Sequence, residues 1–244
     1  MSLQQQIADW LAQRLAMTRA SGFVFGLSGG VDSATTAALA VRAVGSTAVL
    51  GAILPCHSAP IDARLAQRVA DAFDVPTVTV NLDDGFDALI ASLPPSDHRL
   101  AAANIKPRLR MTALYYLAQT NHYLVLGSGN RTELMVGYFT KYGDGGADLL
   151  PLGDLYKTEV WELARDLGVP EAVVERTPSG GLWPGQTDEG ELGITYPELD
   201  RVLKAIASQE TSDVDPVTLK EVETMIASSA HKRAMPPTFK RPQH

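Results

Sequence analysis

A β-prone run passes into a glycine-rich loop and then a helix at Phe23-Val24-Phe25-Gly26-Leu27-Ser28-Gly29-Gly30-Val31-Asp32-Ser33. Glycine lets a backbone approach a ligand closely, and the start of the amphipathic helix expected from about Asp32 to Val44 directs free N–H groups at the same place. Ser28 and Ser33 add hydroxyl donors. The carboxylate of Asp32 does not suit bare phosphate, but it suits Mg²⁺. The loop is therefore predicted to hold a magnesium-bound polyphosphate.

This loop differs from the common P-loop, which requires a lysine before its last hydroxyl residue. The run from Ser28 to Ser33 instead resembles the pyrophosphate loop of the ATP pyrophosphatases. Enzymes of that type split ATP between its α and β phosphates and activate a carboxylate or amide as an adenylate. Two alternatives stay open: a glycine-rich turn that merely packs, and the nucleophile elbow that Gly26-x-Ser28-x-Gly30 also fits. The elbow usually follows several strands, and it leaves Asp32 unexplained.

Composition is that of an ordinary globular protein. The chain has 244 residues, of which 45% are hydrophobic and 20% charged, so it can bury a sizeable core. A net charge of -7 argues against nucleic acid as a partner. An anionic substrate then requires a local cluster of lysine and arginine. The single cysteine, Cys56, excludes an intrachain disulfide and a zinc site built on several cysteines.

The N-terminal segment has the spacing of an amphipathic helix. Its apolar residues Ile7, Trp10, Leu11 and Leu15 recur at helical intervals, unlike the continuous apolar core of a signal peptide. No apolar run in the chain reaches membrane length. We therefore expect a cytoplasmic protein without a membrane partner.

Strands and helices alternate through the first half of the chain. Strands are expected at residues 23–25, 47–54, 76–82 and 123–126, and helices at 61–73, 84–93 and 100–119. This alternation predicts an α/β fold, a doubly wound parallel sheet of about five strands with helices on both faces. Ligands of such sheets gather at the carboxyl edge of the strands.

Beyond residue 150 the pattern becomes helical. We expect helices at 154–167, with Asp154 as N-cap, and at 197–208 and 216–229. Residues 177–194 are aperiodic and rich in glycine and proline, which is typical of a lid. The sequence is thus interpreted as one domain, residues 1–244, with a helical C-terminal part from about residue 155.

A second cluster of polar residues follows the predicted strand at 123–126. It comprises Gly127–Glu133 and the glycine-rich, aromatic loop Gly137–Asp148. Glu133 would face Asp32 across the carboxyl edge of the sheet, where the two carboxylates are able to share a magnesium ion. The alternative for Glu133 is an acid in a first helical turn, favoured by the helix dipole.

Further motifs support a family name. They are Asn104–Met111, Gly137–Asp148, Pro151–Thr158, Gly185–Glu189 and His231-Lys232-Arg233. Together with the glycine-rich loop they resemble NAD synthetase, in its ammonia-dependent short form within the ATP pyrophosphatase superfamily. The resemblance implies an adenine nucleotide alpha-hydrolase-like fold and an ATP-dependent ligase. In that reaction the carboxylate of nicotinate adenine dinucleotide is adenylated, pyrophosphate leaves, and ammonia displaces AMP to give NAD.

The resemblance also implies roles for individual residues and a homodimer. Asp32, Glu133 and Lys157 would be catalytic, with Asp32 and Glu133 as the Mg²⁺ ligands. ATP would contact Gly26, Leu27, Ser28, Gly29, Gly30, Val31, Asp32, Ser33, Ser128, Lys157 and Ser179. Nicotinate adenine dinucleotide would contact Arg108, Lys141, Asp148, His231 and Lys232.

Some positions depart from the family pattern. Ser128 and Ser179 stand where many relatives have threonine, and Ile53 stands where some have arginine. Only 27 residues precede Ser28, so we expect no amidase domain and ammonia as the nitrogen donor. Two other functions remain open: a different pyrophosphatase of this fold, acting on another carboxylate or on RNA, and a noncatalytic nucleotide-binding module.

Overall fold

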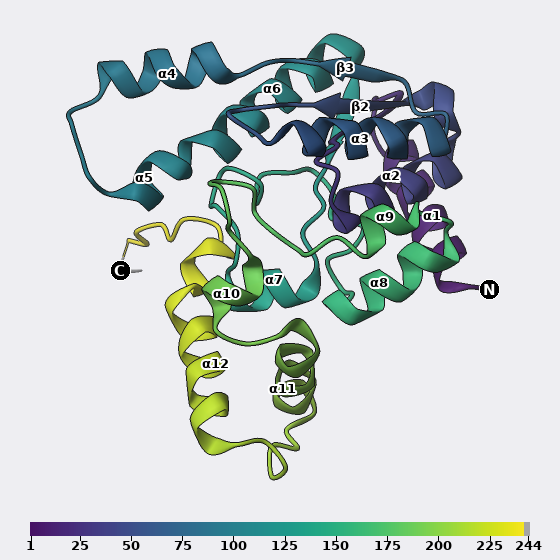
Figure 1. Cartoon of the computed structure of the whole chain (residues 1–244). Coiled ribbons are helices and arrows are strands. Elements are labelled where there is room, and N and C mark those ends of the chain that lie inside the picture. The colour runs from purple at the N-terminus through teal and green to yellow at the C-terminus, as the bar shows by residue number, and fades with distance from the viewer. Residues whose placement is uncertain (242–244) are drawn as a thin grey trace.

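The structure is a computed structural model that describes residues 1–241, and its centre is a parallel sheet (Figure 1). The strand order is β3 (Thr77–Thr79), β2 (Val49–Ile53), β1 (Gly22–Gly26) and β4 (Tyr123–Leu126). All three pairings are parallel. The doubly wound α/β fold is confirmed, and the sheet has four strands within residues 1–241, close to the five expected. One further parallel bridge joins Leu126 to Leu149 beside β4.

Helices cover both faces of the sheet. Successive side chains of a strand point to opposite sides, so each face presents apolar side chains to the helices. Phe23 and Phe25 of β1 belong to the apolar cluster formed with α1 (Leu3–Ala16), α2 (Val31–Val44) and α3 (Pro60–Ala72). Val24, between them, packs on the other side with Val125 and with Ala118 of α6 (Ile105–Asn121). The strands are therefore apolar on both sides, as buried parallel strands are.

The expected helix at 100–119 is divided in two. α5 (Arg99–Ala103) ends at Asn104, and α6 begins at the next residue. Pro107 lies in the first turn of α6, where a helix needs no N–H donor, so it causes no break. α4 (Asp83–Ser92) precedes this pair, and a short 3₁₀ turn spans Ser46–Ala48.

The second half of the chain is helical and builds a second core. Its helices are α7 (Arg131–Val136), α8 (Lys157–Asp166), α9 (Glu171–Val174), α10 (Asp188–Leu192), α11 (Tyr196–Ser208) and α12 (Pro216–Ser228), followed by a 3₁₀ turn at Ala230–Lys232. Leu203 and Val222 belong to the apolar cluster that α7, α10, α11 and α12 share. α11 and α12 stand below the sheet domain in Figure 1.

Two expectations about this half were wrong. The helix at 154–167 begins only at Lys157, with Tyr156 as N-cap, and Asp154 instead pairs with Arg131 at 2.7 Å. The segment 177–194 is not wholly irregular, because it contains α10. The hydroxyl of Thr187 caps that helix, a local pattern that the glycine content of the segment obscured.

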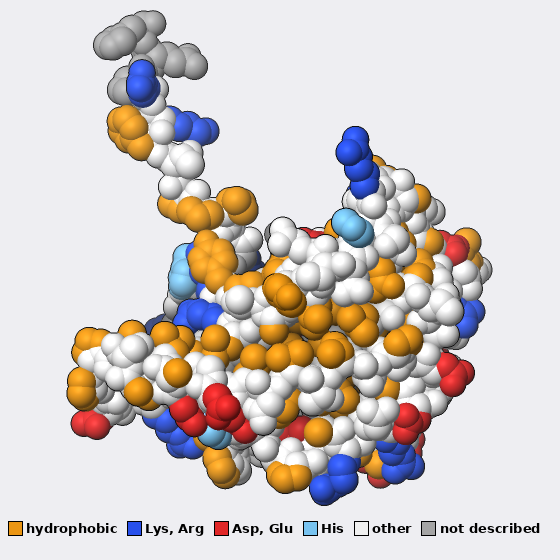
Figure 2. Space-filling view, turned by 90° about the horizontal axis from the view of Figure 1, so that it is seen from above, with side chains coloured by type: hydrophobic (Ala, Val, Ile, Leu, Met, Phe, Trp, Pro, Cys, Tyr) orange, Lys and Arg blue, Asp and Glu red, His pale blue; other side chains and the backbone are white. Residues whose placement is uncertain are grey.

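The surface also has apolar areas. Hydrophobic side chains gather across the middle of the face shown in Figure 2. The last described residues of the chain extend away from the body. Leu89, Leu100 and Tyr116 of α4, α5 and α6 are exposed, as are Met235 and Phe239 near the C-terminus. Within residues 1–241, no helix is long and apolar enough to cross a membrane.

Candidate active site

The glycine-rich loop leaves β1 at Gly26 and enters α2 at Val31. Its two serines bond to each other, with 3.0 Å between their Oγ atoms, and Ser33 Oγ donates to the carbonyl of Gly30 at 2.9 Å. Gly30 is the N-cap of α2 and provides no side-chain acceptor. The first N–H groups of this 14-residue helix therefore face the loop, as in sites that bind anions.

Gly29 is required by both backbone shape and space. Its φ is +77°, and an added Cβ would lie 2.6 Å from the carbonyl oxygen of Asp62. The loop thus packs directly on the start of α3. Arg176 holds this junction, because its guanidinium donates to the carbonyl of Gly29 at 3.3 Å and pairs with the Asp62 carboxylate. Arg176 was not predicted from the sequence, although it is the only basic residue between Arg165 and Arg201.

A buried lysine joins the two predicted metal ligands. Lys157, the first residue of α8, places its Nζ 2.5 Å from Asp32 Oδ2 and 3.3 Å from Glu133 Oε1. The lysine side chain is 1% exposed, whereas the side chains of Asp32 and Glu133 are 18% and 16% exposed. The fold therefore brings together all three residues predicted to be catalytic. They lie at the carboxyl edge, where the strand order reverses between β1 and β4.

Asn130 aligns both carboxylates and was not predicted from the sequence. Its Oδ1 accepts from the N–H of Glu133 at 3.0 Å, and Glu133 Oε2 accepts from the N–H of Asn130 at 3.3 Å. This reciprocal pair is a capping box, and Asn-x-x-Glu was its available sequence signal. Asn130 Nδ2 also donates to Asp32 Oδ1 at 2.9 Å. Asn130 thereby fixes the distance between the two acids.

The acids outnumber the lysine. Asp188 of α10 is buried near Glu133, and the hydroxyl of Tyr196 donates to Asp188 Oδ2 at 3.0 Å and lies 3.5 Å from Glu133 Oε1. Burial raises the pKa of Glu133 to about 8, with Lys157 opposing this change and the charges of Asp32 and Asp188 adding to it. Burial by itself would lower the pKa of Lys157, but Asp32 and Glu133 raise it above its ordinary value. The lysine is thus held charged in a site with excess negative charge.

This donor set fits a magnesium ion. Among the described residues, no group of three or more His, Cys, Asp or Glu side chains is arranged to enclose a metal. Mg²⁺ does not need such a cage, because it commonly binds one or two carboxylates together with waters and substrate phosphates. Asp32 and Glu133, both partly exposed beside the glycine-rich loop, meet that requirement.

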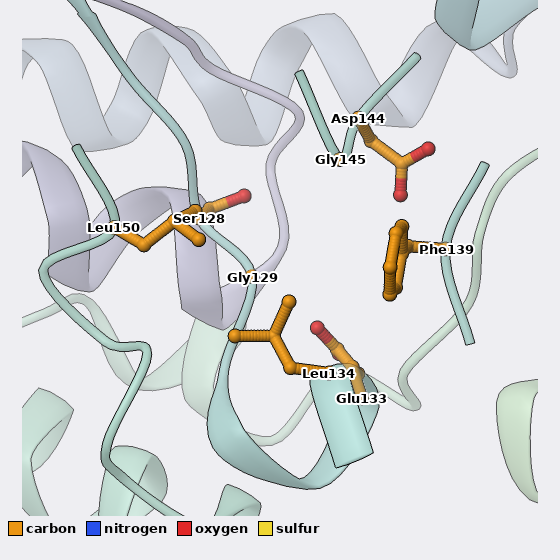
Figure 3. Close-up of a pocket in the computed structure, with 8 residues that line it drawn as sticks. All are labelled: Ser128, Gly129, Glu133, Leu134, Phe139, Asp144, Gly145 and Leu150. Atoms are coloured by element: carbon orange, nitrogen blue, oxygen red, sulfur yellow. The ribbon is translucent and has the colours of Figure 1, made fainter. Parts of the chain in front are cut away.

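A small cavity opens next to Glu133 (Figure 3). Ser128 lies on one side of it, Phe139 and Asp144 lie on the other, and Glu133 lies below. The remaining lining residues are Gly129, Leu134, Gly145 and Leu150. Ser128, predicted to contact ATP, therefore lies with Glu133. Ser179, the other predicted serine, lies in the segment 177–194 and accepts from the N–H of Gly181 at 3.1 Å.

Four of the five residues predicted for the dinucleotide gather beside the loop 137–148. Lys141 Nζ donates to the carbonyl of His231 at 2.6 Å, and Arg108 Nη2 donates to the carbonyl of Lys141 at 3.4 Å. Lys232 Nζ donates to the carbonyls of Gly137 and Phe139. The fifth residue, Asp148, has other partners: its carboxylate accepts from the N–H of Val125 at 2.8 Å and from the hydroxyl of Tyr115 at 3.1 Å.

The sheet is parallel, an anion-binding loop follows its first strand, and acidic residues lie where the strand order reverses. These features define a nucleotide-binding protein of the doubly wound class. The chain belongs to the NAD synthase family, whose model matches residues 3–236. An NH(3)-dependent NAD(+) synthetase of Carboxydothermus hydrogenoformans is 48% identical over 95% of this chain and 94% of its own length. One from Finegoldia magna is 44% identical over 97% and 95%. The predicted resemblance is confirmed.

Solved structures agree with this assignment. An NMN synthetase from Francisella tularensis superposes with a TM-score of 0.89 at 37% identity, covering 97% of this chain and 98% of its own. An NH3-dependent NAD synthetase from Campylobacter jejuni gives 0.85 at 26% identity, covering 98% of each chain. A glutamine-dependent NAD+ synthetase from Acinetobacter baumannii gives 0.69 at 27% identity, over 97% of this chain but 46% of its own. Membership of this family argues against both alternatives for the loop, the nucleophile elbow of a hydrolase and a glycine-rich turn that merely packs.

Proposed function

We propose that this chain is a carbon–nitrogen ligase that makes NAD from nicotinate adenine dinucleotide, ammonia and ATP. The carboxylate would be adenylated with release of pyrophosphate, and ammonia would then displace AMP. The observation that carries the proposal is the buried Lys157 held between Asp32 and Glu133 beside an anion-binding loop. The 48% identical relative is named for the same activity.

The charged groups suit cleavage between the α and β phosphates. The loop Gly26–Ser33 and Ser128 would bind the phosphates. Lys157, which pairs with Asp32 beside this loop, would place positive charge next to them. Asp32 and Glu133 would hold Mg²⁺, which when bound neutralises charge on the leaving pyrophosphate. Because Lys157 is buried, its fixed charge would act strongly on the charge that develops during the reaction.

The basic cluster beside the loop 137–148 suits the dinucleotide. Arg108, Lys141, His231 and Lys232 converge there, although the chain as a whole carries a net charge of -7. The carboxylate of Asp148 accepts hydrogen bonds from Val125 and Tyr115. These bonds favour a role for Asp148 in holding the loop 137–148 in place over a direct contact with substrate.

We further propose a cytoplasmic homodimer. The apolar surface of Figure 2 supports an interface on that face. Size-exclusion chromatography with light scattering should give twice the chain mass of 26.2 kDa. A monomer at micromolar concentration would contradict the dimer without affecting the proposed reaction.

Product analysis tests the reaction directly. Purified protein is incubated with Mg-ATP, ammonium and nicotinate adenine dinucleotide, and NAD, AMP and pyrophosphate are measured together. Equal amounts of the three products are expected. Release of ADP and phosphate, or AMP formation without NAD, would overturn the assignment.

The mononucleotide is a second candidate substrate, because the 37% identical structure is named NMN synthetase. Nicotinate mononucleotide should be assayed in parallel, with kcat/KM compared between the two. We expect the dinucleotide to be preferred, in agreement with the names of the relatives at 44% and 48% identity. A higher kcat/KM for the mononucleotide would move the proposal to that substrate.

A further inference from the structure

A buried aspartate behind the active site has no assigned role. Asp200 lies in the second turn of α11 and is 2% exposed. Within the described residues, no lysine, arginine or histidine forms an ion pair with it. Its carboxylate is instead satisfied by a hydroxyl and a backbone amide. A buried carboxylate with such specific partners is costly to keep, so it requires an explanation.

The partners of Asp200 come from α7 and α8, the helices that carry Glu133 and Lys157. Thr132 Oγ1 of α7 donates to Asp200 Oδ1 at 2.5 Å, and the N–H of Thr158 of α8 donates to Oδ2 at 2.8 Å. Glu133 follows Thr132 in the sequence, and Lys157 precedes Thr158. One carboxylate therefore contacts a neighbour of each member of the Glu133–Lys157 pair.

A third hydrogen bond joins the two helices directly. The N–H of Lys157 donates to Thr132 Oγ1 at 2.9 Å, so the hydroxyl donates to Asp200 and accepts from Lys157 at the same time. The two donors from α8, the N–H groups of Lys157 and Thr158, lie in its first turn. The helix dipole favours a negative charge there, such as that of Asp200. The chain of bonds sets the start of α8 against the start of α7.

We propose that Asp200 is a positioning residue, which with Thr132 holds α7 and α8 so that Lys157 Nζ lies between Asp32 and Glu133. This inference rests on the proposed function for its kinetic consequence, but its geometric content is independent of it. Asp200 and Thr132 are 2% and 0% exposed, so neither side chain is open to a bound substrate. A displacement of about 1 Å in catalytic groups lowers a rate by about 100-fold, so the expected effect is large.

Kinetics of matched variants provide the first test. Thr132→Val replaces the hydroxyl with a methyl of similar shape, and Asp200→Asn removes one of the two acceptors. Each should lower kcat by about 10- to 100-fold. The KM for ATP should change by less than about threefold, because an interaction that matters in the transition state is lost. Thr132→Ser keeps the hydroxyl and should retain near wild-type kcat.

A control separates positioning from general destabilisation. Leu203→Ala truncates a fully buried side chain on the same helix, with an expected cost of about 2–5 kcal/mol. Assayed well below its melting temperature, it should keep kcat. If Leu203→Ala and Thr132→Val lower kcat equally, the proposal is wrong. The double variant Thr132→Val with Asp200→Asn should be no slower than the more impaired single variant, since both remove one chain of bonds.

Chemical labelling tests the geometry without activity. Lys157 is 1% exposed, so an N-hydroxysuccinimide ester should acylate it slowly, as followed by mass spectrometry of its peptide. Thr132→Val should accelerate labelling of Lys157 by at least about tenfold if the lysine leaves its carboxylates, whereas Leu203→Ala and Thr132→Ser should not. Unchanged labelling in folded Thr132→Val would overturn the proposal. If the wild-type chain forms no NAD yet labelling follows this pattern, the proposed function fails and the positioning role stands.

Discussion

The glycine-rich loop and the cluster around Lys157 lie side by side but are built differently. The hydrogen bonds within the loop join residues at most five positions apart, such as Ser28 and Ser33. The cluster joins Lys157 to Asp32, 125 positions away, and depends on Asn130, Tyr196 and Asp200 from other segments. The bonds inside the loop are therefore local, although its outer support by Arg176 comes from a distant segment. The cluster exists only once the sheet and the C-terminal helices have met.

Removing one carboxylate from the cluster is expected to have the largest effect. Asp32→Asn and Glu133→Gln should each lower kcat by about 100-fold or more, because a neutral amide binds Mg²⁺ poorly and metal stabilisation supplies several kcal/mol. Steady-state NAD formation measures this, with circular dichroism to verify folding. Asp154→Asn, at a 94% exposed acid nearby, is the control and should remain active. Near wild-type turnover of either cluster variant would show that its carboxylate is not a ligand.

The loop can be broken by a single methyl group. Gly29→Ala forces a left-handed backbone at φ +77° on a residue with a Cβ, and it places that atom 2.6 Å from a backbone oxygen. We expect a loss of about 1–3 kcal/mol in the free energy of unfolding, and weaker ATP binding, because the loop must shift away from α3. Urea denaturation and the KM for ATP measure the two effects. Gly45→Ala, at φ +80° with open space around it, separates backbone strain from the clash. Equal losses in both variants would exclude the contact with α3 as a cause.

The segment 177–194 is predicted to be a lid, and its two halves should differ. Residues 179–185 are mostly exposed, whereas Gln186 and Asp188 are buried and bond to Glu191 and Tyr196. Limited proteolysis with a protease of broad specificity should cut first within residues 179–185. Both substrates together should slow this cut, because a closed lid keeps an acyl adenylate from water. Cutting in the exposed connection 93–97 is the internal control. Equal slowing at both places, or none at either, would contradict the lid.

The smallest effect is expected at Cys56. Burial raises the pKa of its thiol, and the residue is 0% exposed, so it stays protonated and unreactive near neutral pH. Cys56→Ser should leave the ammonium reaction nearly unchanged, and glutamine should fail to replace ammonium. A chromogenic disulfide should label the native thiol slowly at pH 8 and the urea-unfolded thiol rapidly. Robust glutamine-dependent turnover, free of contaminating ammonia, would contradict the prediction that ammonia is the nitrogen donor.

Much of this molecule was accessible from the sequence because its signals are short in range. The alternation of apolar strands with periodic helices predicted the parallel sheet, and Ser28–Ser33 with the loop Gly137–Asp148 predicted the family. Errors arose where a local pattern has a close competitor. Asp154 is a good N-cap residue, but the helix begins three residues later, where Tyr156 and Glu159 form the capping arrangement. The segment 177–194 is rich in glycine, yet Thr187 starts a helix inside it.

Residues 23–33 show their chemistry in their own sequence, since the glycines, the hydroxyls and the start of a helix are the parts of an anion site. The bond of Asn130 to Asp32 and the contacts of Arg176 and Asp200 are different in kind, because each depends on a partner brought close by the packing of distant elements. Arg176 reaches Gly29 across 147 positions, and Asp200 reaches Thr132 across 68. A side chain satisfied by one neighbour within a turn of helix leaves a mark in the sequence, whereas one satisfied across the core does not. For that reason the chemistry of the loop could be predicted from the sequence. The residues that hold Lys157 between Asp32 and Glu133 could be identified only from the tertiary structure.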